Sequence, residues 1–467
     1  MRILSSEVLR RIDQEVELAG WVDARRDHGK LIFIDLRDRK GIVQLVFSAK
    51  DEELRKQADR LRPEWVIQAK GTVAKRPADM VNAELETGEL EVQVSELQIL
   101  AEAETPLFPL DDEGYEINEE LRLKYRYLDL RRPRLQKNIK LRSEFIRRIR
   151  EFLFSKDFIE IETPLLTKAT PEGARDFIVP ARLQPGKFFA LPQSPQQYKQ
   201  LLMIAGFERY FQIARAIRDE DLRADRGFEH TQIDLEMSFV EQKDVMALDE
   251  EMITNVVETM GYKIKEKPFP VLSYKEAVDK FSEDKFDLRT EEEKKNGILA
   301  FAWVVDFPFF EKDKYNINEG RWTFTHNPFS EPKAEHIDWL LKGENIEEIL
   351  TSQYDLVCNG YEVGGGSIRA NKPEILRAVF KVMGYEDKKI EKEFGHMLEA
   401  FRFGAPPHGG IAHGVERLIM VLAGEEYLRE VQAFPQTGSG RTSVMDAPSE
   451  VDEKQLKELG IKVIKKK

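Results

Sequence analysis

The sequence predicts an α+β protein in which a small N-terminal β-barrel precedes a larger domain built on an antiparallel sheet with flanking helices. Before about residue 100, short segments alternate apolar and polar residues, which is the pattern of half-buried strands. Beyond residue 136, helical and strand-like patterns are interspersed, as in α+β domains. With 41% hydrophobic and 34% charged residues, the composition is that of a globular protein, which excludes fibrous and largely disordered classes.

Five short strands are expected in the first domain, which is predicted to cover residues 1–102. Turn-forming stretches such as Arg39-Lys40-Gly41 separate the alternating segments. Five strands within on the order of 100 residues favour a five-stranded OB barrel. The segments cover residues 16–22, 31–36, 42–47, 65–73 and 90–100.

A linker or hinge is predicted over residues 103–136, where the charge changes sign. Residues 101–120 contain eight acids, no lysine or arginine, and the helix breakers Pro106, Pro109 and Gly114. Residues 121–150 contain twelve lysines or arginines against two acids. This basic run indicates a place where a polyanion could lie, although a solvated helix face is the more common explanation of such a run.

The second domain, predicted over residues 137–467 with a short C-terminal extension, mixes helices with strands. Helices are expected at residues 137–156, 194–205 and 243–260, where apolar residues recur with helical spacing. Strands are expected at residues 210–218, 231–240, 301–307 and 354–369. The mixture predicts an antiparallel sheet with helices against it.

Several classes of protein are excluded by simple observations. No apolar run approaches the ~18 residues of a membrane-spanning helix, and the N-terminus has no apolar core of a secretory signal. The single cysteine, Cys358, cannot form an internal disulfide, which favours a reducing cytoplasm. The net charge of −13 argues against a nucleic-acid partner only as a total, because it says nothing about where the charges lie. We therefore expect a cytoplasmic protein with no membrane partner.

A polar hairpin is predicted over residues 217–239, IRDEDLRADRGFEHTQIDLEMSF. A strand ends in Arg218-Asp219-Glu220, and a second strand begins near His230. Such a hairpin can hold an arginine against a phosphate while a carboxylate and a ring grip a base. A surface hairpin with ordinary salt bridges explains the same composition.

A second hairpin is predicted in QYDLVCNGYEVGGGSIR, residues 353–369. Asn359-Gly360 is a strong signal for a two-residue turn, which would pair Cys358 with Tyr361 and place Val357 opposite Glu362. Asp355 would then lie diagonally from Glu362, at about 7 to 8 Å between backbones. Two such carboxylates can share or flank a divalent cation, and Mg²⁺ held with nucleotide phosphates is the expected ion. The alternative is a glycine bulge in an edge hairpin, with Arg369 as a structural arginine.

A third segment, GAPPHGGIAHGVERLIMVLAG, leads from glycines into a helix that is expected to begin around Val415. A helix N-terminus after such a turn can bind an anion, and Arg417 in its first turn can reach the same anion. A packing turn against the sheet is the alternative. The sequence contains neither a Walker loop nor a Rossmann glycine pattern, so nucleotide binding of those two kinds is not supported.

Taken together and in this order, these segments resemble class II aminoacyl-tRNA synthetases, specifically the bacterial aspartyl type. Pro164 in FIEIETPLL matches the first class motif, which builds the dimer interface; IRDED matches the second and GVERLI the third. The N-terminal segment GWVDARRDHGKLIFIDLRDRKGIVQLVF is similar to the anticodon-binding OB domain of that family. Further matches are PEGARDF, LPQSPQQYKQLLM, THNPFS and NGYEVGGGSIR.

The resemblance implies that L-aspartate is activated with ATP and Mg²⁺ to aspartyl-adenylate and then transferred to the 3′ end of tRNA(Asp). It assigns the catalytic roles to Arg218, Glu362 and Arg417, and the Mg²⁺ ligands to Asp355 and Glu362. The implied ATP-binding residues are Arg218, Asp219, Glu220, Glu362, Gly414, Val415, Glu416 and Arg417. The implied L-aspartate-binding residues are Glu172, Gln196, Lys199, Arg218, His326 and Arg369, with Gln232 and Asp234 as weaker candidates.

The resemblance also implies a homodimer whose barrel reads the anticodon. The matching positions in the barrel are Arg26, Phe33, Gln44 and Glu91. His28 stands where a histidine accompanies enzymes that charge both tRNA(Asp) and tRNA(Asn), so a non-discriminating enzyme is the hypothesis and a strictly tRNA(Asp)-specific one the alternative. The remaining alternative is that His28 is a loop histidine without consequence.

The chain departs from the bacterial pattern at several places. Residues 281–300 lead almost directly into FAWVVDFPFFE, where bacterial relatives carry an inserted domain on the order of 100 residues. Gly227 and His230 replace the usual glutamine and phenylalanine of the second motif, so an imidazole would stack on adenine. An alternative hypothesis is a synthetase-like protein without aminoacylation activity. An asparaginyl- or lysyl-tRNA synthetase is a less favoured alternative.

Overall fold

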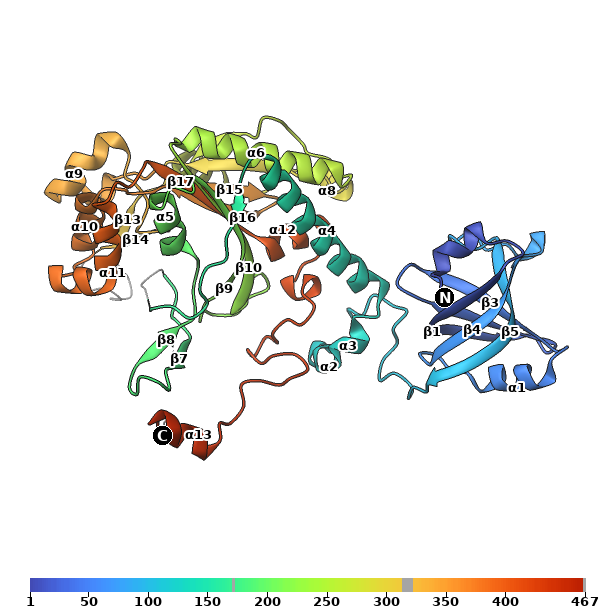
Figure 1. Cartoon of the computed structure of the whole chain (residues 1–467). Helices are drawn as coiled ribbons and strands as arrows, with labels where there is room; N and C mark the ends of the chain where they lie inside the picture. Colours follow the sequence, from blue (N-terminus) through green and yellow to red (C-terminus); the bar gives the residue numbers. More distant parts are fainter. Residues whose placement is uncertain (170–172, 313–321, 465–467) are drawn as a thin grey trace. The chain divides into compact units, whose positions relative to one another are not determined.

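The computed structural model describes residues 1–169, 173–312 and 322–464, which form two compact units, Met1–Asp112 and Glu113–Lys467. The smaller unit is a β-barrel, and the larger one combines an antiparallel-rich sheet with helices (Figure 1). The α+β prediction and the predicted barrel are therefore confirmed. Each unit has its own apolar core.

The smaller unit is a closed barrel with strand order β1-β2-β3-β5-β4. Its five strands lie where the alternation of apolar and polar residues predicted them, because every second side chain points into the barrel core. A helix that the sequence analysis did not identify, α1, lies between β3 and β4 and starts at an Asp51 cap. The elements are β1 Glu15–Asp27, β2 Leu31–Arg37, β3 Ile42–Ser48, α1 Glu52–Arg60, β4 Val66–Lys75 and β5 Leu90–Ala101.

The barrel closes where two glycines let strands approach. A Cβ on Gly20 would lie 2.2 Å from the Arg37 carbonyl oxygen, and one on Gly71 would lie 2.3 Å from that of Gln93. The register of β1 also shifts between Val22 and Ala24. Such bulges and glycines bend strands, which a five-stranded barrel requires.

The predicted linker over 103–136 is divided by the structure. The smaller unit extends to Asp112, and the residues from Glu113 onward belong to the larger unit. Short helices α2, Glu119–Lys124, and α3, Arg126–Asp129, lie in this stretch.

Four arginines of the basic run after the linker are held in buried or nearly buried ion pairs, while Lys124, Lys137, Lys140 and Arg147 are exposed. Asp129 accepts from both Arg126 and Arg132 at 2.7 Å. Glu430 in the C-terminal part of the chain pairs with Arg122 at 2.7 Å and with Arg134 at 2.8 Å. The pairs with Glu430 join this stretch to the C-terminal part of the unit, and the charges of these four arginines are not available to a partner.

The larger unit is built on an eight-stranded sheet with order β11-β12-β15-β16-β17-β10-β9-β6. Only the outer pairs β11/β12 and β6/β9 are parallel. The β15–β16 hairpin lies in the middle of this sheet, so the alternative of an edge hairpin is wrong. The strands are β6 Ile159–Glu160, β9 Arg209–Ile217, β10 Glu229–Ser238, β11 Val271–Ser273, β12 Phe301–Val305, β15 Gln353–Cys358, β16 Tyr361–Ile368 and β17 His408–Gly414.

Helices cover both faces of the sheet (Figure 1). The long helices α4, Pro133–Ser155, and α6, Gln242–Thr259, pack with α12, Val415–Ala423, against one face and enclose the main core. Helix α5, Gln196–Ile204, packs against β9 and β10 and also contacts α11. The remaining elements are β7 Ile178–Pro180, β8 Phe188–Ala190, α7 Tyr274–Phe281, α8 Glu291–Lys295, β13 Phe310–Lys312, β14 Trp322–Phe324, α9 Ile337–Lys342, α10 Pro373–Val382, α11 Asp387–Phe401 and α13 Glu453–Leu459.

A buried histidine ties the centre of the sheet to α6. His413 on β17 is fully buried, and its Nε2 lies 2.6 Å from Asp249 Oδ1 while its Nδ1 lies 3.2 Å from the Val363 carbonyl oxygen. Since both ring nitrogens face acceptors, the ring carries both protons. Burial lowers the pKa of His413, but the Asp249 carboxylate outweighs burial, and the net pKa is raised.

The variant Asp249→Asn is expected to lower the free energy of unfolding by about 3–5 kcal/mol, the cost of leaving one member of a buried ion pair alone. Because the folded-state pKa of His413 is raised, the stabilisation is fully present below about pH 6.5 and is lost as the pH rises through the raised pKa. Urea unfolding should show a deficit that is largest near pH 6. Glu251→Gln, at an exposed position of α6, is the control; a pH-independent deficit contradicts a charged His413.

Candidate active site

The β15–β16 hairpin forms the centre of the candidate site. Asn359 and Gly360 have φ values of 54° and 90°, as a two-residue turn of the predicted kind requires. The predicted pairs Cys358 with Tyr361 and Val357 with Glu362 are present. The register then shifts, so Asp355 lies opposite Gly365. The predicted simple diagonal relation is therefore corrected by a bulge at Val363.

The two carboxylates nevertheless converge over Gly365. A Cβ built on Gly365 would lie 3.0 Å from Asp355 Oδ1 and 3.6 Å from Glu362 Oε1. Asp355 is 2% exposed and accepts from Gln353 Nε2 at 2.6 Å. Burial, and then the charge of Glu362, raise the pKa of Asp355 well above its ordinary value. Asp355 is thus a buried carboxylate that needs a cation to hold its charge.

Glu362 has cations close to it. Lys285 Nζ lies 2.9 Å from Glu362 Oε2, and Arg417 Nη1 lies 3.9 Å from the same oxygen. Burial alone would raise the pKa of Glu362, but the charges of Lys285 and Arg417 lower the pKa below its usual range. Glu362 is therefore ionised, whereas the ionised form of its neighbour Asp355 is disfavoured.

The donors around Gly365 fit a divalent cation. Asp284, His326 and Asp355 each offer one ligand atom, and these atoms lie within 4.8 Å of one another. Carboxylate oxygens are the ligands that Mg²⁺ and similar hard cations prefer. Gly365 leaves the space beside both carboxylates open. His326, expected to contact the amino acid, lies 3.9 Å from Asp355 Oδ2.

The loop of the β9–β10 hairpin begins at Arg218 and contacts Arg417 through Asp225. Arg417 Nη1 donates to the Glu362 carbonyl oxygen at 2.9 Å, and its Nη2 lies 3.0 Å from Asp225 in the loop. Arg218 Nε donates to the Gln193 carbonyl oxygen at 3.2 Å. Burial, followed by the charges of Arg218 and Arg417, lowers the pKa of His230 to about 3. A neutral imidazole thus lies beside two arginines that can bind phosphate.

Four further predicted residues shape the loop and the start of α12. Asp219 donates its backbone N–H to the Arg175 carbonyl oxygen at 3.0 Å, and Glu220 lies 3.6 Å from Arg226. Gly414 is the N-cap of α12, and Val415 is buried in the core.

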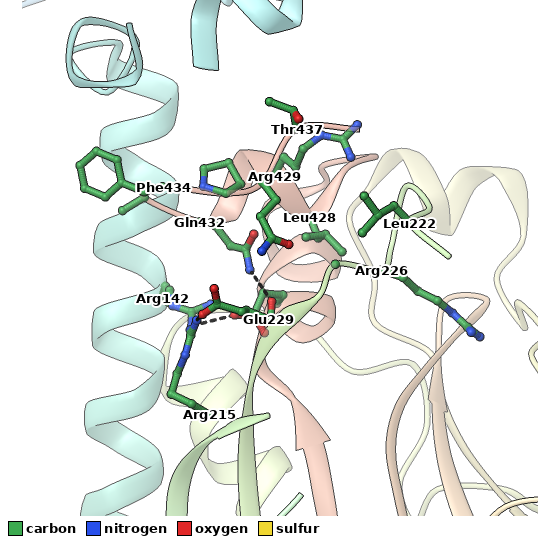
Figure 2. Close-up of a pocket in the computed structure, with 15 residues that line it drawn as sticks. Arg142, Arg215, Leu222, Arg226, Glu229, Leu428, Arg429, Gln432, Phe434 and Thr437 are labelled. Carbon is green, nitrogen blue, oxygen red and sulfur yellow. Dashed lines mark hydrogen bonds and ion pairs between the residues drawn. The ribbon is translucent and has the colours of Figure 1, made fainter. Parts of the chain in front are cut away.

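Glu416 links the start of α12 to β10 and α4. Its carboxylate accepts from the Thr231 backbone N–H at 2.9 Å and pairs with Arg142 on α4 at 2.9 Å. It lines a pocket of about 260 Å³ between α4, the β9–β10 hairpin and the C-terminal segment, where Arg215 pairs with Glu229 at 2.6 Å (Figure 2). These contacts fix the start of α12, which carries Arg417.

A buried cluster of opposite charges lies between α5, β10 and the end of β16. Lys199 Nζ lies 2.8 Å from Asp234 Oδ2 and 3.3 Å from Glu236 Oε2. Arg369 Nε donates to Glu236 Oε1 at 2.9 Å. Each of these four side chains is at most 3% exposed. Gln196, on the same helix as Lys199, donates to Gln200 at 3.1 Å.

Sequence reasoning missed Glu236. Its charge holds both Lys199 and Arg369, and those cations outweigh burial and lower the pKa of Glu236. The sequence could have indicated Glu236, because it lies two residues after Asp234 and four after Gln232, on the same face of the predicted strand. Gln232 is buried on β10. Glu172, assigned to the amino acid, lies outside the described residues.

In the smaller unit, the predicted anticodon residues form a connected group. Arg26 donates to both oxygens of Asp35 at 2.6 and 2.8 Å and to Gln44 at 3.3 Å; Gln44 donates to Glu91 at 3.1 Å. Phe33 is 9% exposed and contacts His28 edge-on, with 5.4 Å between ring centroids.

Arg76 was missed by the sequence analysis. Its Nε donates to the Leu90 carbonyl oxygen at 2.8 Å, while its buried Nη2 has no hydrogen-bond partner among the described residues. No local pattern singles out this arginine, because its neighbours Asp35 and Glu91 come from other strands.

Comparison with known proteins identifies the family. Residues 118–438 match the tRNA synthetases class II (D, K and N). The chain belongs to this family. Residues 16–100 of the synthetase match the OB-fold nucleic acid binding domain. The family resemblance in the sequence is thereby confirmed.

Individual relatives cover nearly the whole synthetase. It is 42% identical to the Aspartate--tRNA(Asp/Asn) ligase of Rubrobacter xylanophilus, over 96% of this chain and 94% of that protein. It is 39% identical to the Aspartate--tRNA ligase of Staphylococcus saprophyticus, over 97% of each. The crystal structure of asparaginyl-tRNA synthetase from Pyrococcus horikoshii with asparaginyl-adenylate superposes with a TM-score of 0.74 at 25% identity, covering 94% and 98% of the two chains.

The alignment with the Rubrobacter protein spans 574 positions, more than the 467 residues of this chain, so that relative holds segments that this synthetase lacks. This agrees with the expected loss of an inserted domain; in the structure only α8 lies between α7 and β12. No helix in the described part of the chain has the length and apolarity to cross a membrane.

The variant Gly365→Ala is expected to weaken divalent-cation binding by about 10- to 100-fold, the range found when groups around a metal site are changed. Its Cβ would fill the space beside Asp355 Oδ1 at 3.0 Å. Mn²⁺ binding followed by electron paramagnetic resonance measures the effect, with the melting temperature as a check of the fold. Gly395→Ala, on α11, is the control, and unchanged Mn²⁺ affinity in Gly365→Ala contradicts this cation site.

Proposed function

We propose that this synthetase is an aspartate–tRNA ligase. It activates L-aspartate with ATP to aspartyl-adenylate and transfers the aspartyl group to the 3′ end of tRNA(Asp). The observation that carries this proposal is the buried pair of cations, Lys199 and Arg369, at the predicted amino-acid positions. Relatives near 40% identity are named as aspartate ligases, which favours aspartate over the asparagine and lysine branches of the family.

Lys199 and Arg369 each have one N–H donor that is not used in the contacts with their protein partners among the described residues. Arg369 uses four of its N–H groups on Glu236, Ser367 and the Gly410 carbonyl oxygen, out of the five that a guanidinium has. Lys199 uses two contacts, with Asp234 and Glu236, out of three donors. One donor on each can therefore meet the side-chain carboxylate of aspartate.

This arrangement explains rejection of asparagine. The amide group of asparagine would turn an N–H toward at least one of these donors, and the buried donor would then lack an acceptor. Sites built to bond a particular polar group discriminate strongly against analogues that lack it. Glu236 and Asp234 act as positioning residues that hold the cations in place.

The first step requires charge stabilisation at the phosphates of ATP. Arg218 and Arg417 supply fixed positive charge, Glu220 contacts the nucleotide, and the neutral ring of His230 stacks on adenine. The α-carboxylate oxygen of aspartate attacks the α-phosphorus, and pyrophosphate leaves. Such reactions are accelerated by positioning and by preorganised charge.

Asp355 and Glu362 are the proposed ligands of Mg²⁺. When bound, the cation supplies neutralisation of the phosphate charge. The open space beside Gly365 and the carboxylate oxygens support this assignment. In the second step, the terminal ribose hydroxyl of the tRNA attacks the aspartyl carbonyl carbon, and AMP leaves.

The barrel is proposed to bind the anticodon through Arg26, Phe33, Gln44 and Glu91. Hydrogen bonds join Arg26, Gln44 and Glu91, and Arg26 lies opposite Phe33 in the β1–β2 ladder, which supports a shared role. Stacking of a base on Phe33 would contribute about 1–3 kcal/mol. His28 contacts Phe33, so a change at residue 28 can alter how an anticodon base is held. Charging of both tRNA(Asp) and tRNA(Asn) is proposed on this ground.

A cytoplasmic homodimer is also proposed. Strand β6 ends the sheet, and the resemblance places the dimer motif around it. Large apolar side chains there are exposed: Phe154, Ile159, Leu165 and Leu166. A second copy of the chain would cover them.

The variant Arg369→Ala is expected to reduce aspartate-dependent ATP–pyrophosphate exchange by at least about 10²- to 10³-fold, because a preorganised donor is removed. Circular dichroism and the melting temperature check that the variant folds. Arg377→Ala, at a surface ion pair of α10, is the matched control. Exchange near the wild-type rate in Arg369→Ala would contradict the assignment of Arg369 to aspartate binding.

Wild-type enzyme is expected to aspartylate a tRNA(Asn) transcript, and His28→Leu is expected to lower this activity while tRNA(Asp) charging persists. The reason is that an imidazole both contacts the Phe33 ring and offers a hydrogen bond, whereas leucine offers only the contact. Lys30→Leu, an exposed change in the same loop, is the control. No charging of tRNA(Asn) above background by the wild type rejects the non-discriminating reading.

A further inference from the structure

Two consecutive residues, Asp284 and Lys285, each face one of the carboxylates of the cation site. The Asp284 carboxylate belongs to the cluster whose ligand atoms, with those of His326 and Asp355, lie within 4.8 Å of one another. Lys285 Nζ lies 2.9 Å from Glu362 Oε2. Neither residue has a role in the proposed mechanism, and the motifs of the sequence do not include them.

The loop that carries Lys285 is fixed to the hairpin that carries the carboxylates. Ser282 ends α7 in the left-handed region, with φ of 65°. Phe286 is buried and stacks on Phe281 with ring centroids 4.4 Å apart. Its carbonyl oxygen accepts from the Gly360 N–H, at the turn of the β15–β16 hairpin, at 3.0 Å. These contacts of Phe286 fix the position of its neighbour Lys285 beside Glu362.

Among the described residues, Lys285 is the nearest cation to the Glu362 carboxylate. Arg417 Nη1 is farther from the same oxygen, at 3.9 Å, and Arg417 Nη2 is engaged with Asp225. A carboxylate oxygen that accepts from an ammonium group has its negative charge compensated, so a metal ion gains less by binding there. An arriving cation must move Lys285 or tolerate its charge at close range.

We propose that Lys285 is a built-in counter-ion of the cation site, which neutralises Glu362 in the nucleotide-free enzyme and moves to the phosphates when the cation arrives with ATP. This inference rests on the proposed cation ligands Asp355 and Glu362. Lys285 is then a positioning residue: it disfavours binding of a free divalent cation and favours the cation–nucleotide complex. The nucleotide phosphates provide the new partner that lets the ammonium group leave Glu362.

The test compares Mn²⁺ affinity of the nucleotide-free full-length enzyme by electron paramagnetic resonance. Lys285→Met should bind Mn²⁺ more tightly than the wild type, by about 5- to 150-fold, the usual size of a coupling between two sites. Lys275→Met, which removes an exposed lysine of α7, should leave Mn²⁺ affinity unchanged. Equal or weaker Mn²⁺ binding by Lys285→Met overturns the proposal.

Two further measurements locate the effect. Adding Asp355→Asn to Lys285→Met should abolish the gain; a gain that persists places the Mn²⁺ elsewhere and overturns the proposal. Adding a non-hydrolysable ATP analogue should increase Mn²⁺ affinity more in the wild type than in Lys285→Met, and equal increases overturn the exchange of partners. Aspartate-dependent pyrophosphate exchange by the wild type tests the proposed function separately, since it is independent of the Lys285 result.

Discussion

The catalytic unit depends on keeping four charged side chains paired inside the sheet. Lys199, Arg369, Asp234 and Glu236 come from three elements, and each would be strongly unfavourable if buried alone. Glu236 is the centre of the cluster, since it contacts both cations. Helix α5 and the end of β16 must therefore lie beside β10. The same requirement that stabilises the interior also fixes the orientation of the Lys199 and Arg369 donors.

Glycines on the neighbouring strands make this interior possible. A Cβ on Gly410 of β17 would lie 2.3 Å from Glu236 Oε2, and one on Gly364 of β16 would lie 2.4 Å from His413 Nδ1. Gly365 leaves the space beside the Asp355 and Glu362 carboxylates open. The central strands thus lack side chains where buried polar groups or ligands need room. This is why binding groups can occupy the middle of a continuous sheet.

The arginines of the larger unit divide into two kinds. Some of those after the linker, such as Arg126, are buried and donate to carbonyl oxygens near Glu430, so they hold distant segments together. Arg218 and Arg417 border the candidate nucleotide site, where burial, followed by their charges, lowers the pKa of His230. A run of basic residues in the sequence does not distinguish these uses, because a partner such as Glu430 lies some 300 residues away in the chain. Net charge is equally uninformative about them.

Local patterns were sufficient for most elements and for part of the site. Alternation located the barrel strands, Asn359-Gly360 located the central turn, and glycines before Val415 located α12, because each depends on short-range backbone geometry. The motifs likewise identified the family. Which residues these side chains contact was decided by the tertiary structure. Only the folded sheet brings together the strands and loops that form the bulge at Val363, the cluster around Glu236 and the contact of Lys285 with Glu362. Contacts between residues far apart in the chain leave no periodic signal, so charge pairing and space for ligands were set by tertiary packing.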